Sequence, residues 1–170
     1  MEKKKNFVIG TLLVAIVLMS VGYAALAQVL TINGTANIDA SWDVEITGIT
    51  EGNLKGATTK TITSNATSAT FNVDLAYPGA TASYEVAIEN KGSIDAVLES
   101  ISGVDAVNAA LPTEVQYTIT GVKTGDELAS GATTKAIVTV TWVSKADNSD
   151  TIPTTTSKTA TINLNYVQNT

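Results

Sequence analysis

The stretch Val73–Ile101, which reads VDLAYPGATASYEVAIENKGSIDAVLESI, decides the fold class. Apolar and polar residues alternate on both sides of Pro78-Gly79, and the second alternation ends at Asn90-Lys91-Gly92-Ser93. A two-residue period is typical of a strand with one buried face, and Pro-Gly and Asn-x-Gly sequences favour tight turns. The stretch therefore predicts antiparallel strands joined by short turns.

The same two-residue period returns in blocks that are separated by segments rich in Gly, Ser, Thr, Asn and Asp. The blocks lie at residues 71–75, 84–88, 94–101, 115–119, 136–142 and 160–166. With a further alternating stretch at residues 30–46, these short strands with one dry and one wet face predict an all-β fold of seven or more strands, a single antiparallel β-sandwich of jelly-roll or immunoglobulin-like architecture. An N-terminal hydrophobic signal or anchor helix is expected to precede it.

Several finer expectations follow from the residues between the blocks. Polar composition predicts loops at residues 50–68, 102–113 and 144–157, with room for a short strand at 60–63 in the first and a short helix at 104–111 in the second. Trp42 and Trp142 both fall on apolar faces, so we expect both indoles in the core.

The first 27 residues have the three parts of an export signal. Met1–Lys5 is positively charged, Phe7–Val21 is apolar, and Ala25 and Ala27 supply the small residues that a signal peptidase needs before Gln28. We expect a signal peptide at residues 1–27, in transient contact with the membrane and a peptidase, and a mature domain at 28–170. If the run is not cut, it could remain as a membrane anchor, and the domain is still extracellular or displayed on the cell surface.

Regular alternation begins directly after the predicted cut. Every even position from Leu30 to Ile46 is apolar or small, and every odd position from Thr31 to Glu45 is polar. This pattern predicts extended chain with one buried face. Its first part, residues 28–38, is the candidate assembly segment, and its apolar face carries Leu30, Ile32, Gly34, Ala36 and Ile38.

Composition excludes most other functions. The net charge is −6 and all ten basic residues are lysines, which argues against nucleic-acid binding. Histidine and cysteine are absent, so the usual zinc site, the usual serine–histidine pair and disulfides are absent too. We predict no catalytic, metal-binding or cofactor-binding residue, no small-molecule substrate and no enzyme activity. An oxygen-rich cluster at Asp147–Asp150 leaves calcium open, but it lacks the spacing of an EF-hand loop, which favours a solvated turn.

The segment from Leu75 to Leu98, together with the signal region, resembles the TasA/camelysin family of exported proteins of Gram-positive bacteria. The resemblance rests on a strand that leads into a Pro-Gly turn, a second strand, and an Asn-x-Gly-Ser step. It implies a jelly-roll-like subunit of biofilm matrix or surface fibres, in which signal cleavage frees an N-terminal strand that completes the sheet of the next subunit. Some members carry a metallopeptidase label, which a chain without histidine does not support.

Two functional interpretations follow. In the first, residues 28–38 add as a donor strand to a neighbouring copy, and main-chain hydrogen bonds build a homopolymer. In the second, the same residues form the first strand of the chain's own sheet, and the protein is a monomeric adhesion or recognition module on the cell surface.

Overall fold

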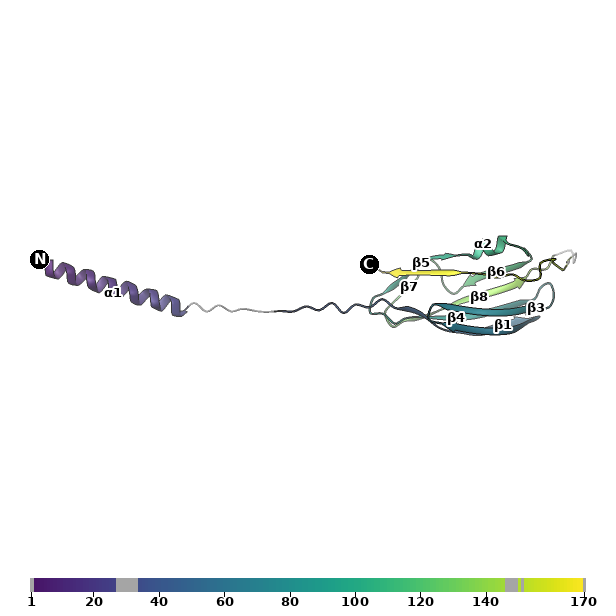
Figure 1. The fold of residues 1–170 in the computed structure, drawn as a ribbon, viewed down its shortest axis with the longest axis horizontal. Coiled ribbons are helices and arrows are strands. Elements are labelled where there is room, and N and C mark those ends of the chain that lie inside the picture. The colour runs from purple at the N-terminus through teal and green to yellow at the C-terminus, as the bar shows by residue number, and fades with distance from the viewer. Residues whose placement is uncertain (1, 27–33, 146–149, 151, 170) are drawn as a thin grey trace. The chain divides into compact units, whose positions relative to one another are not determined.

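The computed structural model describes residues 2–26, 34–145, 150 and 152–169, and the chain divides into two compact units between Ile38 and Asp39 (Figure 1). The first unit contains one helix, α1 (Glu2–Leu26). No helix in the described part of the chain is both long enough and apolar enough to cross a membrane. The second unit holds all of the strands in the described residues.

The second unit is all-β apart from one short helix. Its elements are β1 (Val44–Lys55), β2 (Ala57–Asn65), β3 (Ser68–Leu75), β4 (Thr81–Asn90), β5 (Ala96–Ser102), α2 (Val104–Ala109), β6 (Val115–Thr120), β7 (Glu127–Leu128), β8 (Thr133–Trp142) and β9 (Asn163–Gln168). They form a four-stranded sheet in the order β1-β4-β8-β6, a two-stranded sheet β2-β3, and a three-stranded sheet β7-β5-β9. Every pairing is antiparallel, as the alternating sequence predicts.

Strand β4 is the centre of the fold, because it pairs with β1 on one side and with β8 on the other. Its even-numbered residues Ala82, Tyr84, Val86 and Ile88 each leave 8% or less of their surface exposed. The odd-numbered residues between them are half-buried. Burial of each large side chain stabilises the fold by about 1.5–3 kcal/mol, so this one strand anchors much of the core.

The buried face of β4 contributes to two core clusters. Toward Asn90, Val86 and Ile88 pack with Ala96 and Leu98 of β5 and with Leu128 of β7. Toward Thr81, the cluster of Ala82 and Tyr84 includes Val107 of α2, and partly buried side chains of β2 and β3 pack against it. The two-stranded and three-stranded sheets thus pack against the same face of the four-stranded sheet, and the two-stranded sheet reaches both clusters, since Ala69 of β3 packs against the first.

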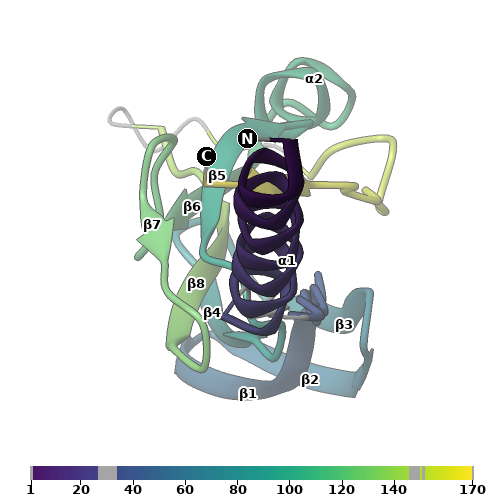
Figure 2. The same ribbon diagram turned by 90° about the vertical axis from the view of Figure 1, so that its left-hand side faces the viewer.

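An aromatic pair joins β3 to β4 within the second cluster. The rings of Phe71 and Tyr84 stack with centroids 4.0 Å apart and planes inclined by 19°. The Tyr84 hydroxyl shares a 2.9 Å hydrogen bond with Thr59 Oγ1 of β2, so this buried phenol keeps a polar partner. In Figure 2, β1, β2 and β3 lie together along the lower edge of the domain.

The Pro-Gly turn forms as predicted. Ala80 N donates to Tyr77 O at 3.0 Å, and Gly79 has φ of 90°, which is the geometry of a type II turn with glycine in its third position. Gly79 N also donates to Trp142 O at 2.7 Å, and Trp142 N donates to Ala80 O at 2.9 Å. The turn between β3 and β4 is therefore fixed to the end of β8.

The loop predicted over residues 50–68 is wrong, because strands occupy nearly all of it. β1 runs to Lys55, the chain turns at Gly56 with φ of 59°, and β2 pairs with β3 from Ala57 to Asn65. The segment is rich in threonine, whose branched side chain suits a strand although it lacks the apolar alternation. The predictions of a short helix within 104–111 and of a loop in the described part of 144–157 are confirmed.

The continuous strand predicted from Leu30 to Ile46 is also wrong over residues 34–43, which have no regular secondary structure. The strand begins at Val44, the first residue in register with β4, while Leu30 and Ile32 lie outside the described residues. Alternation of apolar and polar residues shows which face of a strand would be buried, but a strand forms only where a neighbouring strand supplies hydrogen bonds. Trp42 belongs to this segment and is 40% exposed, so its predicted place in the core is wrong as well.

We expect the domain to lose stability in alkali. Burial raises the pKa of Tyr84, Tyr117 and Tyr166, so these phenols ionise in the unfolded chain near pH 10 but at higher pH in the folded one. Their contribution is complete below pH 10 and is lost as the pH rises further. Burial lowers the pKa of Lys158, so this ammonium group has the opposite effect on the pH dependence of stability. Three phenols outweigh it.

Urea unfolding at pH 8 and pH 11 measures this, and the free energy of unfolding should fall between the two. Tyr117→Phe should make the fall smaller. An unchanged or rising free energy of unfolding contradicts the assignment of these buried phenols.

Candidate assembly site

The predicted assembly segment is exposed wherever the structure describes it. Residues 34–40 have no regular secondary structure, all seven are exposed, and Ile38 leaves 95% of its surface in solvent. Ala36 and Ile38 therefore remain available for a partner. Of the residues predicted around the cleavage point, Ala25 lies in the last turn of α1, while Ala27, Gln28, Leu30 and Ile32 lie outside the described residues.

In the described residues, hydrogen bonds between the N-terminal segment and the domain begin at Ser41 and Asp43. Asp43 O accepts hydrogen bonds from Lys91 N at 2.7 Å and from Gly92 N at 3.1 Å, and Ser41 O accepts one from Ser93 N at 3.0 Å. Ser93 Oγ in turn accepts a 2.9 Å bond from Ser41 N. We call this pairing of residues 41–43 with residues 91–93 the anchor. It fixes the point at which the exposed segment leaves the domain.

Glycine is required at position 92 because two backbones meet there. A Cβ atom on Gly92 would lie 2.5 Å from Ser41 O and 2.8 Å from Asp43 N. These are main-chain atoms, so no side-chain rotation could make room for it. The Asn-x-Gly-Ser step thus does more than turn the chain after β4, because its glycine admits the incoming segment.

Asn90 supports the anchor from beneath and is completely buried. Its Nδ2 donates to Ile94 O at 2.8 Å and to Leu128 O at 3.0 Å, and its Oδ1 accepts from Gly92 N at 3.1 Å. Its main-chain groups bond to Ala132 O and Gly131 N. A buried amide with all these partners is strongly fixed, since loss of the side chain would leave the carbonyls of Ile94 and Leu128 without this donor.

Sequence reasoning placed Asn90–Ser93 in a turn but missed that they hold the N-terminal segment. The signal was present in part: an asparagine at an even, core-facing position of β4 calls for several internal hydrogen bonds. Its partners come from residues 94 and 128, and those of Gly92 and Ser93 come from residues 41–43. No local pattern could reveal contacts that span about 50 residues.

The electrostatics at the anchor are acidic. Glu45 and Glu89 are opposite each other in the β1–β4 register, and Lys91 Nζ lies 2.6 Å from Glu45 Oε2. The hydrogen bond and charge of Glu45 raise the pKa of Lys91, which lies at the surface. This exposed ion pair relieves the repulsion between the two carboxylates and adds little stability of its own.

Each sheet in the described residues ends in two strands with one unpaired edge, six strands in all, and two of these, β9 and β3, have apolar faces that are only partly buried. β9 is the last strand of the three-stranded sheet, and β3 forms one side of the two-stranded sheet. The apolar side chains along these strands pack on the core, yet all remain only partly buried: Ala69, Phe71, Val73 and Leu75 on β3, and Ala160, Ile162, Leu164 and Tyr166 on and before β9. The core is thus covered less completely along these two edges than along β4.

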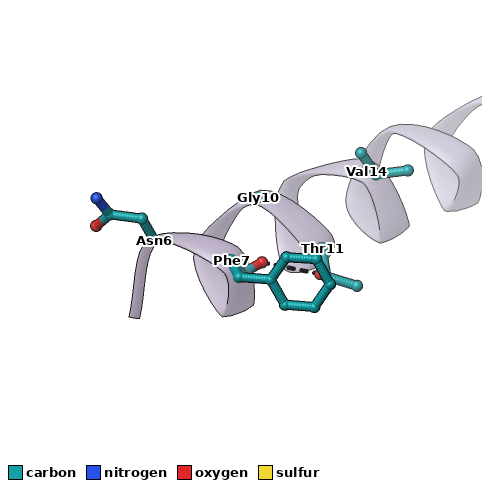
Figure 3. Close-up of a pocket in the computed structure, with 5 residues that line it drawn as sticks. All are labelled: Asn6, Phe7, Gly10, Thr11 and Val14. Carbon is teal, nitrogen blue, oxygen red and sulfur yellow. Dashed lines mark hydrogen bonds between the residues drawn. The ribbon is translucent and has the colours of Figure 1, made fainter. Parts of the chain in front are cut away.

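Other features offer no chemistry in the described residues. No group of three or more carboxylates there is placed to hold a metal ion. Asp150, from the oxygen-rich cluster, accepts hydrogen bonds from Lys145 N at 2.8 Å and Ser144 Oγ at 3.2 Å, whereas Asp147 to Ser149 lie outside the described part. A hollow along α1 is open and carries no titratable group; it is lined by Asn6, Phe7, Gly10, Thr11 and Val14 (Figure 3).

We expect Gly92→Ala to release the anchor. The added methyl group collides with main-chain atoms of Ser41 and Asp43, which should destabilise the domain by about 1–3 kcal/mol. Amide hydrogen exchange should speed up at Ser41, Lys91 and Ser93. Gly48→Ala is the matched control, because a Cβ atom there meets nothing within 4 Å. Equal protection of the three amides in both variants would show that Gly92 is not needed for the close approach.

No family model, curated protein or solved structure matches this chain.

Proposed function

We propose that this chain is an exported structural subunit of extracellular or cell-surface fibres, and that the subunits join through addition of the N-terminal segment to the sheet of a neighbour. One observation carries the proposal. Residues 34–40, which come directly before the anchor, are exposed and pair with no strand in the described residues. Ala36 and Ile38 nevertheless belong to an alternating pattern that is typical of a half-buried strand. In the part that the structure describes, the segment has the sequence of a strand but pairs with no other strand.

The open edges of β3 and β9 supply a place for that strand. Together with the packing of both smaller sheets on one face of the four-stranded sheet, they favour a β-sandwich whose second layer lacks a strand. An inserted strand would extend that layer to β2-β3-donor-β9-β5-β7. Its even-numbered side chains would cover the partly buried residues of β3 and β9, and its main chain would satisfy both edges.

The length of the segment fits this role. Residues 28–38 span about 36 Å when fully extended, more than the about 20 Å of a six-residue strand such as β9. A donor that leaves one copy and enters another makes a head-to-tail contact, which repeats without closing and produces a filament. Cleavage before Gln28, as the signal pattern predicts, would free the donor. We propose a structural protein and not an enzyme.

The resemblance to exported fibre subunits of the TasA/camelysin type agrees with this proposal. The Pro-Gly turn that carries the resemblance is formed, and the Asn-x-Gly-Ser step provides the anchor. The Asn-x-Gly-Ser step places the N-terminal segment, which supports its use in assembly, while the Pro-Gly turn joins β3 and β4 at the opposite end of the domain.

The apolar face of the segment can be tested with a matched pair of charge substitutions. Ile38→Asp places a carboxylate on the face that would enter the neighbour's core, while Asn37→Asp places the same charge on the polar face. In cells that express the full chain, we expect negative-stain microscopy to show fibres for Asn37→Asp and none for Ile38→Asp or for deletion of residues 28–38. The exported proteins should keep the same circular dichroism.

Fibres that persist after the deletion would refute assembly through this segment. Loss of fibres in both charge variants alike would refute the alternating, strand-like insertion. An exported protein that stays monomeric without any substitution would favour the surface adhesion module instead.

A further inference from the structure

The end of the β domain opposite the anchor is unusually apolar. Five of the six large apolar side chains that are exposed in residues 39–169 lie there, with exposed fractions from 37% to 80%: Leu54, Tyr77, Leu111, Val143 and Ile152. We call these five residues the tip. The sixth, Trp42, lies at the anchor. Scattered exposed apolar residues are ordinary, but their concentration at one end of a domain is typical of an interaction surface.

Hydrogen bonds and strand register bring four of the tip residues together from distant parts of the chain, and Ile152 follows Asp150, which accepts a hydrogen bond from Lys145 N just after Val143. Leu54 ends β1 opposite Ala82, and the turn at Tyr77 is bonded to Trp142. Val143 N donates to Glu114 O at 2.7 Å, which places the loop after Leu111 beside the end of β8. In Figure 1, this end of the domain holds α2 and the segment after β8, whereas the C-terminus and β7 are at the other end.

The two ends also differ in charge. Carboxylates greatly outnumber lysines around the anchor and the neighbouring ends of β4, β5 and β7: Asp39, Asp43, Glu45, Glu89, Asp95, Asp126 and Glu127 against Lys91 and Lys123. Beside the tip, lysines and carboxylates are about balanced, with Lys55, Lys145 and Lys158 near Asp105, Glu114 and Asp150. Two anchor ends would repel each other, whereas an anchor end and a tip would not.

If the proposed function is correct, the short linker between the donor segment and the anchor brings one end of each of two neighbouring domains into contact. Ile38 would lie in the neighbour's core and Ser41 is fixed in its own anchor, so only Asp39 and Ala40 connect the two domains, and the Cα atoms of Ile38 and Ser41 are at most about 11 Å apart. A linker this short leaves the anchor end of one copy in contact with whichever end of the neighbour receives Ile38. The apolar tip, whose lysines and carboxylates are about balanced, is the end that suits this contact.

We infer that the tip is the docking surface for the anchor end of a second copy, and that the donor segment enters the neighbour beside its tip. This inference rests on the proposed function and adds the orientation of the subunits. The donor would run parallel to β3 and antiparallel to β9, because Ile38 would lie near Leu75 and Asn163 while Gln28 would lie toward Ser68 and Gln168. Leu111, Val143 and Tyr77 would cover Trp42, and Lys55 and Lys145 would face Asp39 and Asp43.

Two sets of substitutions in the full chain test the inference. Leu111→Ser with Ile152→Ser removes the two most exposed tip side chains, which should leave the fold intact. Lys55→Glu with Lys145→Glu makes the tip acidic. Lys135→Glu is the control, since Lys135 lies near the start of β8, away from the tip, and its ion-pair partner is half-buried Glu85. We expect at least a tenfold loss of fibre-associated protein, relative to exported monomer, for both tip sets and little change for the control.

Rescue provides the sharpest outcome. Asp39→Lys with Asp43→Lys should restore fibres to the Lys55→Glu, Lys145→Glu chain, because the two ends then have opposite charges again. Tip variants that polymerise like the unaltered chain, while Ile38→Asp does not, would overturn the inference and leave the proposed function standing. Dimers of the chain lacking residues 28–38 that depend on Leu111 and Ile152 would also overturn it, since they would show that tip binds tip.

Discussion

The meeting of two backbones at Gly92 is the contact on which the rest of this structure depends. Residues 41–43 lie close enough to residues 91–93 for Asp43 O to accept two amide hydrogen bonds, and a single methyl group on Gly92 would prevent that approach. Asn90, buried below, bonds to Gly92, Ile94 and Leu128 and so fixes the loop against which the N-terminal segment lies. The anchor lies directly before the start of β1, which pairs with the central strand β4.

The anchor also lies between two parts of one alternating sequence pattern that differ in structure. From Val44 onward the alternating residues have β4 as a partner and form a strand, whereas residues 34–40 carry the same alternation and stay exposed. A polymer that uses this segment would need no new fold, only a neighbour with an open edge. The edges of β3 and β9, with their partly buried apolar residues, fit this requirement. In such a polymer, the short linker between Ile38 and Ser41 would bring the acidic anchor end of one copy against the apolar tip of the next.

Much of the fold could be predicted because its signals are local. The alternation in β4, the type II turn at Pro78-Gly79 and the short helix at Val104–Ala109 all depend on neighbouring residues, and all are present. Predictions failed where a distant partner decides the outcome. Threonine-rich β2 is a strand because β3 pairs with it. Residues 34–43 form no strand because no strand in the described residues pairs with them, and Trp42, which belongs to this segment, stays exposed for that reason. The candidate segment was visible in the sequence, but its anchor joins residues about 50 positions apart and was not.

The most direct test traps the donor in its acceptor. The chain contains no cysteine, so introduced thiols report only the contacts chosen for them. Chains with Asn37→Cys should be expressed together with mass-tagged chains that carry either Asn163→Cys or Gln168→Cys, at the two ends of β9, about 17 Å apart. The account predicts a disulfide between different copies for Asn163→Cys, in fibres and not in exported monomer, and none for Gln168→Cys. Fibres that form without a disulfide at either position, or a disulfide within one chain that carries both Asn37→Cys and Asn163→Cys, would contradict it.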